Sequence, residues 1–216
     1  MEKKTDFKAL SNKAKAQYIW DYYKWPIVLT VAIVSFVVYM IYHYATYHEP
    51  FLNVIMINCN DSISATADGF DEFLTEYGYD PKKSPVSLSS SLHFSEGEYS
   101  MSYNDYQVLT MMIAAGDQDL FFGTGNVFTD YAEQGALIDL STVLPAELLE
   151  QYQDSLLYST DGGEADSYPC AIEITDNAWL KKNNYYDTCY FGIFYQNHNL
   201  EASVQFAEFL LGYDSK

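Results

Sequence analysis

The sequence predicts an α/β domain that follows a single membrane-spanning helix. Three observations lead to this fold class. An uncharged apolar run extends from Pro26 to Tyr44, a short apolar run rich in Ile and Val begins at Phe51, and helix-like and strand-like segments then alternate to the end of the chain. Alternation of this kind is typical of three-layer α/β/α domains built on a largely parallel sheet.

The apolar run is long enough to cross a membrane, because roughly 20 helical residues cover a hydrocarbon core of about 30 Å. Aromatic residues flank it, as expected at the two headgroup levels: Trp20, Tyr22, Tyr23 and Trp25 before it, and Tyr39, Tyr42, Tyr44 and Tyr47 at its end. The alternatives are a buried core helix and a cleaved signal peptide. The run is longer than the roughly 7–15 apolar residues of a signal peptide, and no small-residue cleavage site follows it.

Charge predicts the topology of the chain. Six lysines and three acidic residues precede the span, whereas 27 acidic and five basic residues lie between Glu49 and Lys216, a net charge of −22. Positively charged flanks stay in the cytoplasm. We therefore expect a single-pass plasma-membrane protein with a basic and aromatic cytoplasmic segment (1–25), a transmembrane helix (26–47) and an extracellular domain (48–216). The first segment either lies along the inner leaflet or only sets this topology.

Composition and motifs exclude several classes of function. The 216-residue chain carries a net charge of −19, which repels the phosphates of nucleic acid. No phosphate-binding loop, zinc-protease motif or serine-hydrolase motif occurs, and the acidic loop with Asp161, Glu164 and Asp166 departs from the spacing of an EF-hand. We expect no enzyme activity, no cofactor and no metal.

The first half of the outer domain is expected to form five elements. The continuous apolar run 51–58 predicts a strand buried on both faces. Phe70, Phe73, Leu74 and Tyr77 recur at helical spacing and predict a helix over 61–77, capped by Ser62 or Ser64 and ended by Gly78. Alternation over 86–94 predicts a half-buried strand with Val86, Leu88, Ser90, Leu92 and Phe94 on one face. A helix over 102–115, ended by Gly116, leads to a short strand over 118–122.

The second half continues the alternation. The glycine-rich turn at 123–125 leads into a helix over 126–134, followed by a short strand or edge segment over 135–140 and a helix over 145–156. A strand over 170–174, a helical turn over 177–181, a strand over 188–194 and a helix over 200–211 complete the domain. Cys170 and Cys189 fall in two strands that can be neighbours, and they either form a disulfide or stay buried thiols, while Cys59 is expected to be buried in the first strand.

The run from Gln107 to Pro145 combines several local features. It holds Ala114-Ala115-Gly116-Asp117 with Asp119, the stretch from Tyr131 to Leu137, and Asp139-Leu140 before a proline-bounded loop. In these features it resembles extracytoplasmic solute-binding proteins that serve sugar-importing ABC transporters. The resemblance implies a lobe of a type II periplasmic-binding-protein fold. The outer segment is long enough for about one lobe, and a transmembrane helix replaces the usual lipidated cysteine.

A candidate site follows from the position of the glycine-rich turn. Ligands of α/β sheets bind at the carboxyl ends of strands, so we expect ligand or partner contacts at Phe122, Gly123, Thr124 and Asn126. The glycines would let the backbone approach a partner, and Trp179 would add an aromatic contact. Asp119 is expected to accept hydrogen bonds from loop amides. The alternatives are that the glycines only form a tight turn, that Asp119 only caps this turn, and that the aromatic side chains fill the core.

These inferences predict binding rather than catalysis. The leading hypothesis is a membrane-anchored accessory or binding subunit that docks on a membrane complex such as a transporter. The alternative is a solute-binding protein that presents a sugar or peptide to an ABC permease.

Overall fold

The computed structural model describes residues 11–61, 64–94, 103–159 and 167–213. The chain forms two compact units, Met1–Tyr47 and His48–Lys216. The first unit contains one long helix, α1 (Asn12–Thr46). Within α1, Tyr23–Thr46 is long and apolar enough to cross a membrane, and its residues are not buried in the protein. The apolar run is therefore not a core helix of the outer domain.

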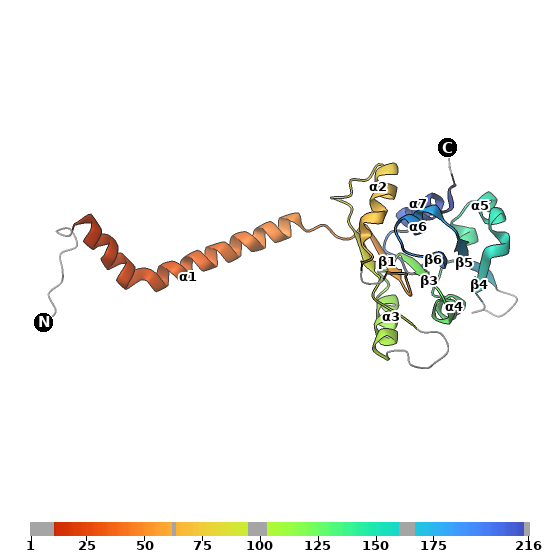
Figure 1. The fold of residues 1–216 in the computed structure, drawn as a ribbon, viewed down its shortest axis with the longest axis horizontal. Helices are drawn as coiled ribbons and strands as arrows, with labels where there is room; N and C mark the ends of the chain where they lie inside the picture. The colour runs from red at the N-terminus through yellow and green to blue at the C-terminus, as the bar shows by residue number, and fades with distance from the viewer. Residues whose placement is uncertain (1–10, 62–63, 95–102, 160–166, 214–216) are drawn as a thin grey trace. The chain divides into compact units, whose positions relative to one another are not determined.

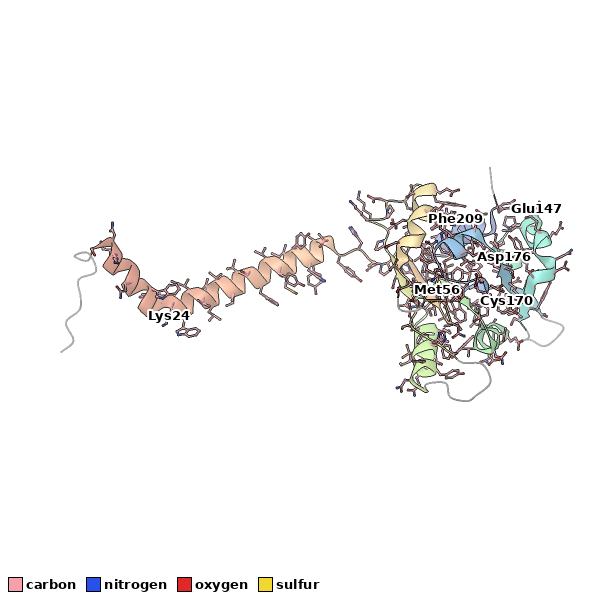
Figure 2. All side chains as sticks on the ribbon, in the orientation of Figure 1. Lys24, Met56, Glu147, Cys170, Asp176 and Phe209 are labelled. Carbon is pink, nitrogen blue, oxygen red and sulfur yellow. The ribbon has the colours of Figure 1, made fainter. Side chains whose placement is uncertain are left out.

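α1 is bent near the position of its proline (Figure 1). Pro26 has no N–H to donate, and its ring clashes with the carbonyl of the preceding turn, so the helix bends there. Lys24 lies at the bend (Figure 2). The hydroxyl of Thr30 donates a hydrogen bond of 2.8 Å to the carbonyl of Pro26.

The second unit is built on a six-stranded sheet in the order β2-β1-β3-β6-β5-β4 (Figure 1). β1 pairs in parallel with both β2 and β3, whereas the pairs β3–β6, β6–β5 and β5–β4 are antiparallel. The strands are β1 (Leu52–Met56), β2 (Val86–Ser89), β3 (Leu120–Gly123), β4 (Leu156–Ser159), β5 (Tyr168–Thr175) and β6 (Thr188–Ile193).

The α/β class is confirmed, but the expectation of a largely parallel sheet is wrong. The chain between β5 and β6 contains only the five-residue helix α6 (Ala178–Lys182). A helix that short cannot carry the chain back along the sheet, as a parallel crossover requires. β6 therefore returns beside β5 in the antiparallel direction.

Side chains on the two faces of the sheet form two separate core clusters. Leu52, Val54 and Met56 of β1 belong to the first core, and Ile55 belongs to the second, because successive side chains of a strand point to opposite faces. The remaining helices are η2 (Ala67–Phe70), α2 (Asp71–Glu76), α3 (Tyr103–Ala115), α4 (Asn126–Glu133), η3 (Leu140–Thr142), α5 (Ala146–Gln151), η4 (Gln153–Ser155) and α7 (Leu200–Leu211). Helices α2, α5, α6 and α7 cover the first core, while α3 and α4 cover the second.

Two expected elements in the first half of the domain are shorter than predicted. The helix expected over 61–77 begins only with η2, and the carboxylate of Asp61 accepts from the amide of Ser64 before it. Ser62 lies outside the described residues. β2 ends at Ser89, and the residues after it change sides: Val86 and Leu88 pack against the first core, whereas Leu92 and Phe94 lie in the second.

Two elements expected in the second half differ from the structure. Within the short strand or edge segment expected over 135–140, Leu137 forms one isolated antiparallel bridge with Phe194, and Asp139 already caps η3 by accepting from the amide of Ser141. The helix expected over 145–156 ends at Gln151, and Leu156 instead begins β4, an edge strand that the sequence analysis missed.

The three cysteines are buried free thiols. Cys189 is paired in register with Ile174, four residues along β5 from Cys170. Four strand positions correspond to about 13 Å along the strand between the Cα atoms of the two cysteines, far beyond the Cα separation of at most roughly 7 Å that a disulfide spans. The disulfide is therefore not formed.

Candidate functional site

The side chain of Asn58 links the carboxyl ends of β1 and β3. Asn58 adopts a left-handed backbone conformation with φ of 57°, which asparagine tolerates better than most residues. Its Nδ2 donates to the carbonyl of Thr124 at 3.2 Å, and its Oδ1 accepts from the amide of Phe94 at 2.5 Å. Asn58 thus holds together three segments that are far apart in sequence.

Gly123, the last residue of β3, and Gly125, in the turn that follows, are each explained by the structure of the domain itself. A Cβ atom on Gly123 would lie 2.3 Å from Cγ1 of Ile57 and 3.2 Å from the ring of Phe128. Gly125 has φ of 79° and ψ of −178°, a conformation open essentially to glycine alone. Gly123 is thus required for packing and Gly125 for backbone conformation, without any partner.

Two of the predicted site residues present polar groups at this edge of the sheet. Thr124 is half-buried, and Asn126 is exposed on the first turn of α4. No side chain caps α4, because its N-cap residue is Gly125. The hydroxyl and amide groups here suit uncharged polar ligands, such as sugar hydroxyls or peptide groups.

Phe122 and Trp179, the two aromatic residues of the predicted site, lie inside the first core. Phe122 is fully buried and packs against Phe191 with ring centroids 4.9 Å apart. Trp179 is 7% exposed and packs edge-on against Phe70 at 5.1 Å. The structure does not place Trp179 with the glycine-rich turn in a surface site.

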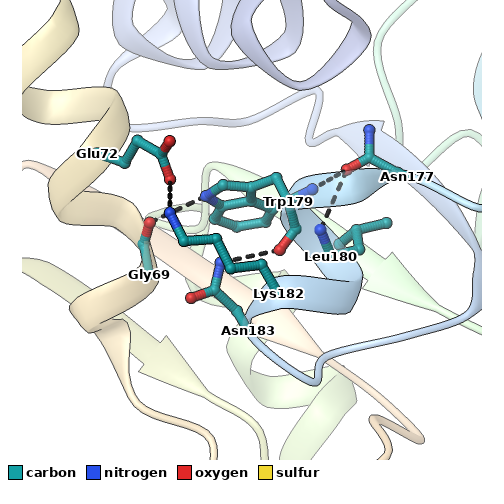
Figure 3. Close-up of polar contacts among 7 residues, drawn as sticks. All are labelled: Gly69, Glu72, Asn177, Trp179, Leu180, Lys182 and Asn183. Atoms are coloured by element: carbon teal, nitrogen blue, oxygen red, sulfur yellow. Dashed lines mark hydrogen bonds and ion pairs between the residues drawn. The ribbon is translucent and has the colours of Figure 1, made fainter.

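Polar contacts hold Trp179 in place (Figure 3). Its indole Nε1 donates to the carbonyl of Gly69 at 2.9 Å. The side chain of Asn177 accepts from the amides of Trp179 and Leu180 and caps α6. Lys182 of α6 forms an ion pair with Glu72 of α2, with 2.7 Å between Nζ and the carboxylate oxygen. Trp179 therefore connects α6 to η2 as part of the fold.

Asp119 organises the opposite edge of the sheet, at the start of β3. It is fully buried, and its carboxylate accepts from the backbone amides of Asn53, His198 and Asn199 at 2.6–2.8 Å. The expectation that Asp119 accepts hydrogen bonds from amides is confirmed. Those amides belong to β1 and to the segment that leads into α7, which sequence reasoning had not identified.

An exposed apolar surface lies on α3, a feature that the sequence analysis did not single out. Among the side chains of α3 that the structure describes, Leu109 alone is fully buried. Tyr106, Val108 and Met111 are 42%, 39% and 64% exposed. From Val108 to Ala115 the helix is apolar except for Thr110, and a helix that is apolar all round is normally buried. The sequence signal was the run QVLTMMIAA, which has no charged residue on any face.

A hydrogen bond between two side chains joins α3 to α4. The hydroxyls of Thr110 and Tyr131 are 2.7 Å apart and join α3 to α4. Burial raises the pKa of Tyr131 to about 12, so it stays protonated. Within the described part of the chain, no group of three or more His, Cys, Asp or Glu side chains could hold a metal ion.

Comparisons of the chain with protein-family models, curated proteins and solved structures find no match.

Proposed function

We propose that the protein is a membrane-anchored extracytoplasmic accessory subunit, and that it docks on a membrane complex, such as a transporter, through the exposed face of α3. The observation that carries this proposal is the exposed apolar pair Val108 and Met111, which are neighbours one turn apart on the same side of α3. Large apolar side chains gathered on one exposed helix mark interaction sites in soluble domains. Methionine is especially suited to such surfaces, because its unbranched side chain adapts to a partner.

Charge defines the kind of partner that fits α3. Acidic residues border the helix, with Asp105 in its first turn and Asp117 just after its end. No basic residue other than histidine occurs between Lys83 and Lys181. The partner surface is therefore apolar at its centre and basic at its rim, since complementary charges steer association and exclude wrong partners.

Gentle detergent extraction followed by mass spectrometry of the co-purifying proteins tests this proposal. The comparison is between the wild type and Met111→Glu, which places a charge in the centre of the α3 surface. A matched control is Tyr158→Glu, because Tyr158 is 46% exposed on the edge strand β4, at the other end of the sheet.

We expect membrane subunits to co-purify in stoichiometric amounts with the wild type and with Tyr158→Glu, and to be lost from Met111→Glu. Equal recovery with all three proteins, or purification of the wild type alone, would contradict docking through α3.

The polar edge after β1 and β3 supports a second candidate function, solute capture for an ABC permease. Thr124 and Asn126 present a hydroxyl and an amide beside the uncapped start of α4. The resemblance of 107–145 to sugar-binding proteins favours the same function. A thermal-shift screen with sugars and peptides tests it, because a ligand that binds only the folded state raises Tm. A shift abolished by Asn126→Ala would make solute capture the leading function, and no shift would count against it.

A further inference from the structure

α1 is longer than a membrane span requires. Its 35 residues extend about 52 Å at 1.5 Å per residue, compared with about 30 Å for the hydrocarbon core. The apolar stretch begins only at Tyr23. The residues from Asn12 to the bend at Pro26 therefore form a helical arm, which we call the α1 arm (Asn12–Trp25) and which shares only its last three residues with the candidate span.

The α1 arm carries the two kinds of side chain that prefer the membrane interface. Trp20 and Trp25 are 62% and 75% exposed in the protein. Lys13 and Lys24 are also exposed. Indole rings favour the headgroup level, while lysine chains lie along apolar surface and extend their charge toward phosphates. An arm that projected straight into water would leave both indole rings in water.

We propose that the α1 arm lies in the cytoplasmic interface of the membrane and binds anionic lipid headgroups. The bend at Pro26 supplies the change of direction that turns the chain from the span into the plane of the membrane (Figure 1). The cytoplasmic leaflet is negatively charged and attracts basic segments next to a span. This inference rests on the membrane anchoring and the cytoplasmic N-terminus that belong to the proposed function, but it is independent of α3.

The test uses the full-length protein in phosphatidylcholine vesicles, with or without phosphatidylglycerol. A cysteine replaces Gln17, an exposed residue in the middle of the α1 arm, and carries an environment-sensitive dye. The native thiols do not compete, since all three are buried. Emission and quenching by aqueous iodide and by headgroup-level spin-labelled lipid then report where the dye lies.

We expect a blue-shifted emission, strong quenching by the labelled lipid and weak quenching by iodide, all more marked with phosphatidylglycerol. Lys13→Gln combined with Lys24→Gln should weaken the dependence on phosphatidylglycerol, since it removes two of the six lysines that precede the span. Pro26→Ala restores the missing backbone N–H. It should straighten α1 and increase the quenching of the dye by iodide.

Full iodide access in both vesicle types, with the protein still retained after alkaline carbonate washing, would overturn the interfacial arm and leave the anchor intact. Release by the carbonate wash would overturn the anchoring and the arm together.

Discussion

Asp119 shows how one buried carboxylate can connect distant parts of the chain. Its two oxygens accept three backbone hydrogen bonds, and its own carbonyl accepts from the amide of Phe194. Hydrogen bonds to a carboxylate are roughly twice as strong as neutral ones. The first strand, the third strand and the start of the last helix are thus held at one position.

Asp119→Ala should lower the free energy of unfolding by about 3 kcal/mol, because buried amides would lose their acceptor. Urea unfolding of the detergent-solubilised protein measures this loss. Asp117→Asn is the control, since Asp117 is exposed, and it should change stability by less than about 0.5 kcal/mol. Similar losses in both variants would contradict the role of Asp119.

The burial of a cysteine thiol and a tyrosine hydroxyl predicts that the domain loses stability at alkaline pH. Burial raises the pKa of Cys170 from 9.0 to about 12 and that of Tyr185 from 10.0 to about 12. The unfolded chain releases these protons at lower pH than the folded chain. Their contribution to stability is therefore complete below about pH 9 and is lost as pH rises toward 12.

Urea unfolding at a series of pH values checks this dependence, together with the absorbance of ionised tyrosine. Cys170→Ala should make the decline with pH less steep. A free energy of unfolding that stays constant from pH 8 to 11 would contradict the prediction.

Gly123 predicts a packing conflict that can be measured as a coupling energy. Gly123→Ala should destabilise the domain by about 2 kcal/mol, because the added methyl group overlaps Ile57. Ile57→Ala removes the atoms that it would meet, so the double variant should lose less stability than the sum of the two single variants. If the double variant instead lost the sum of the two single losses, the added methyl group would not be in conflict with Ile57.

At the scale of elements, α6 depends on its cap. Asn177 accepts from two amides of α6 and also donates to the carbonyl of Leu210 at 2.8 Å. Asn177→Ala should cost about 1–2 kcal/mol of stability. Asn177→Asp keeps the accepting oxygen and should cost less. Thermal unfolding followed by tryptophan fluorescence compares them, and equal losses would show that the cap contributes little.

The elements that could be predicted from the sequence are those with local signals at both ends. α7 has the expected bounds, because Asn199 caps its start and Gly212 ends it with φ of 69°. β4 was missed, because Leu156 to Ser159 follow a helical pattern with no glycine or proline between them. The direction of β6 was missed because strand pairing depends on how the chain returns, which no local pattern encodes.

The candidate site was predicted less well, because the roles of its residues depend on distant partners. Gly123 faces Ile57, more than 60 residues earlier in the chain. Phe122 lies at a strand end, as predicted, but the alternation of β3 turns its side chain into the first core. The exposure of α3 is also not encoded locally, because its apolar residues would read the same in a buried helix.

At the scale of the whole molecule, we expect the second unit to fold without the first. Both core clusters contain residues from β1 onward and none from α1. Residues 48–216, expressed without the anchor, should therefore fold as a soluble domain with a single cooperative transition. Circular dichroism during heating, together with size-exclusion chromatography, checks this. Aggregation or a broad transition at several concentrations would show that the domain needs its anchor to fold.

The position of β1 also has a mechanical consequence. The chain enters the second unit directly into β1, which has hydrogen-bonded neighbours on both sides. The carbonyl of Phe51, just before β1, accepts from the side chain of Asn199 at 3.2 Å. Tension applied through the anchor along this strand is therefore shared by two parallel ladders loaded in shear, together with the cap of the last helix. A tether attached to an edge strand would instead peel one ladder bond by bond.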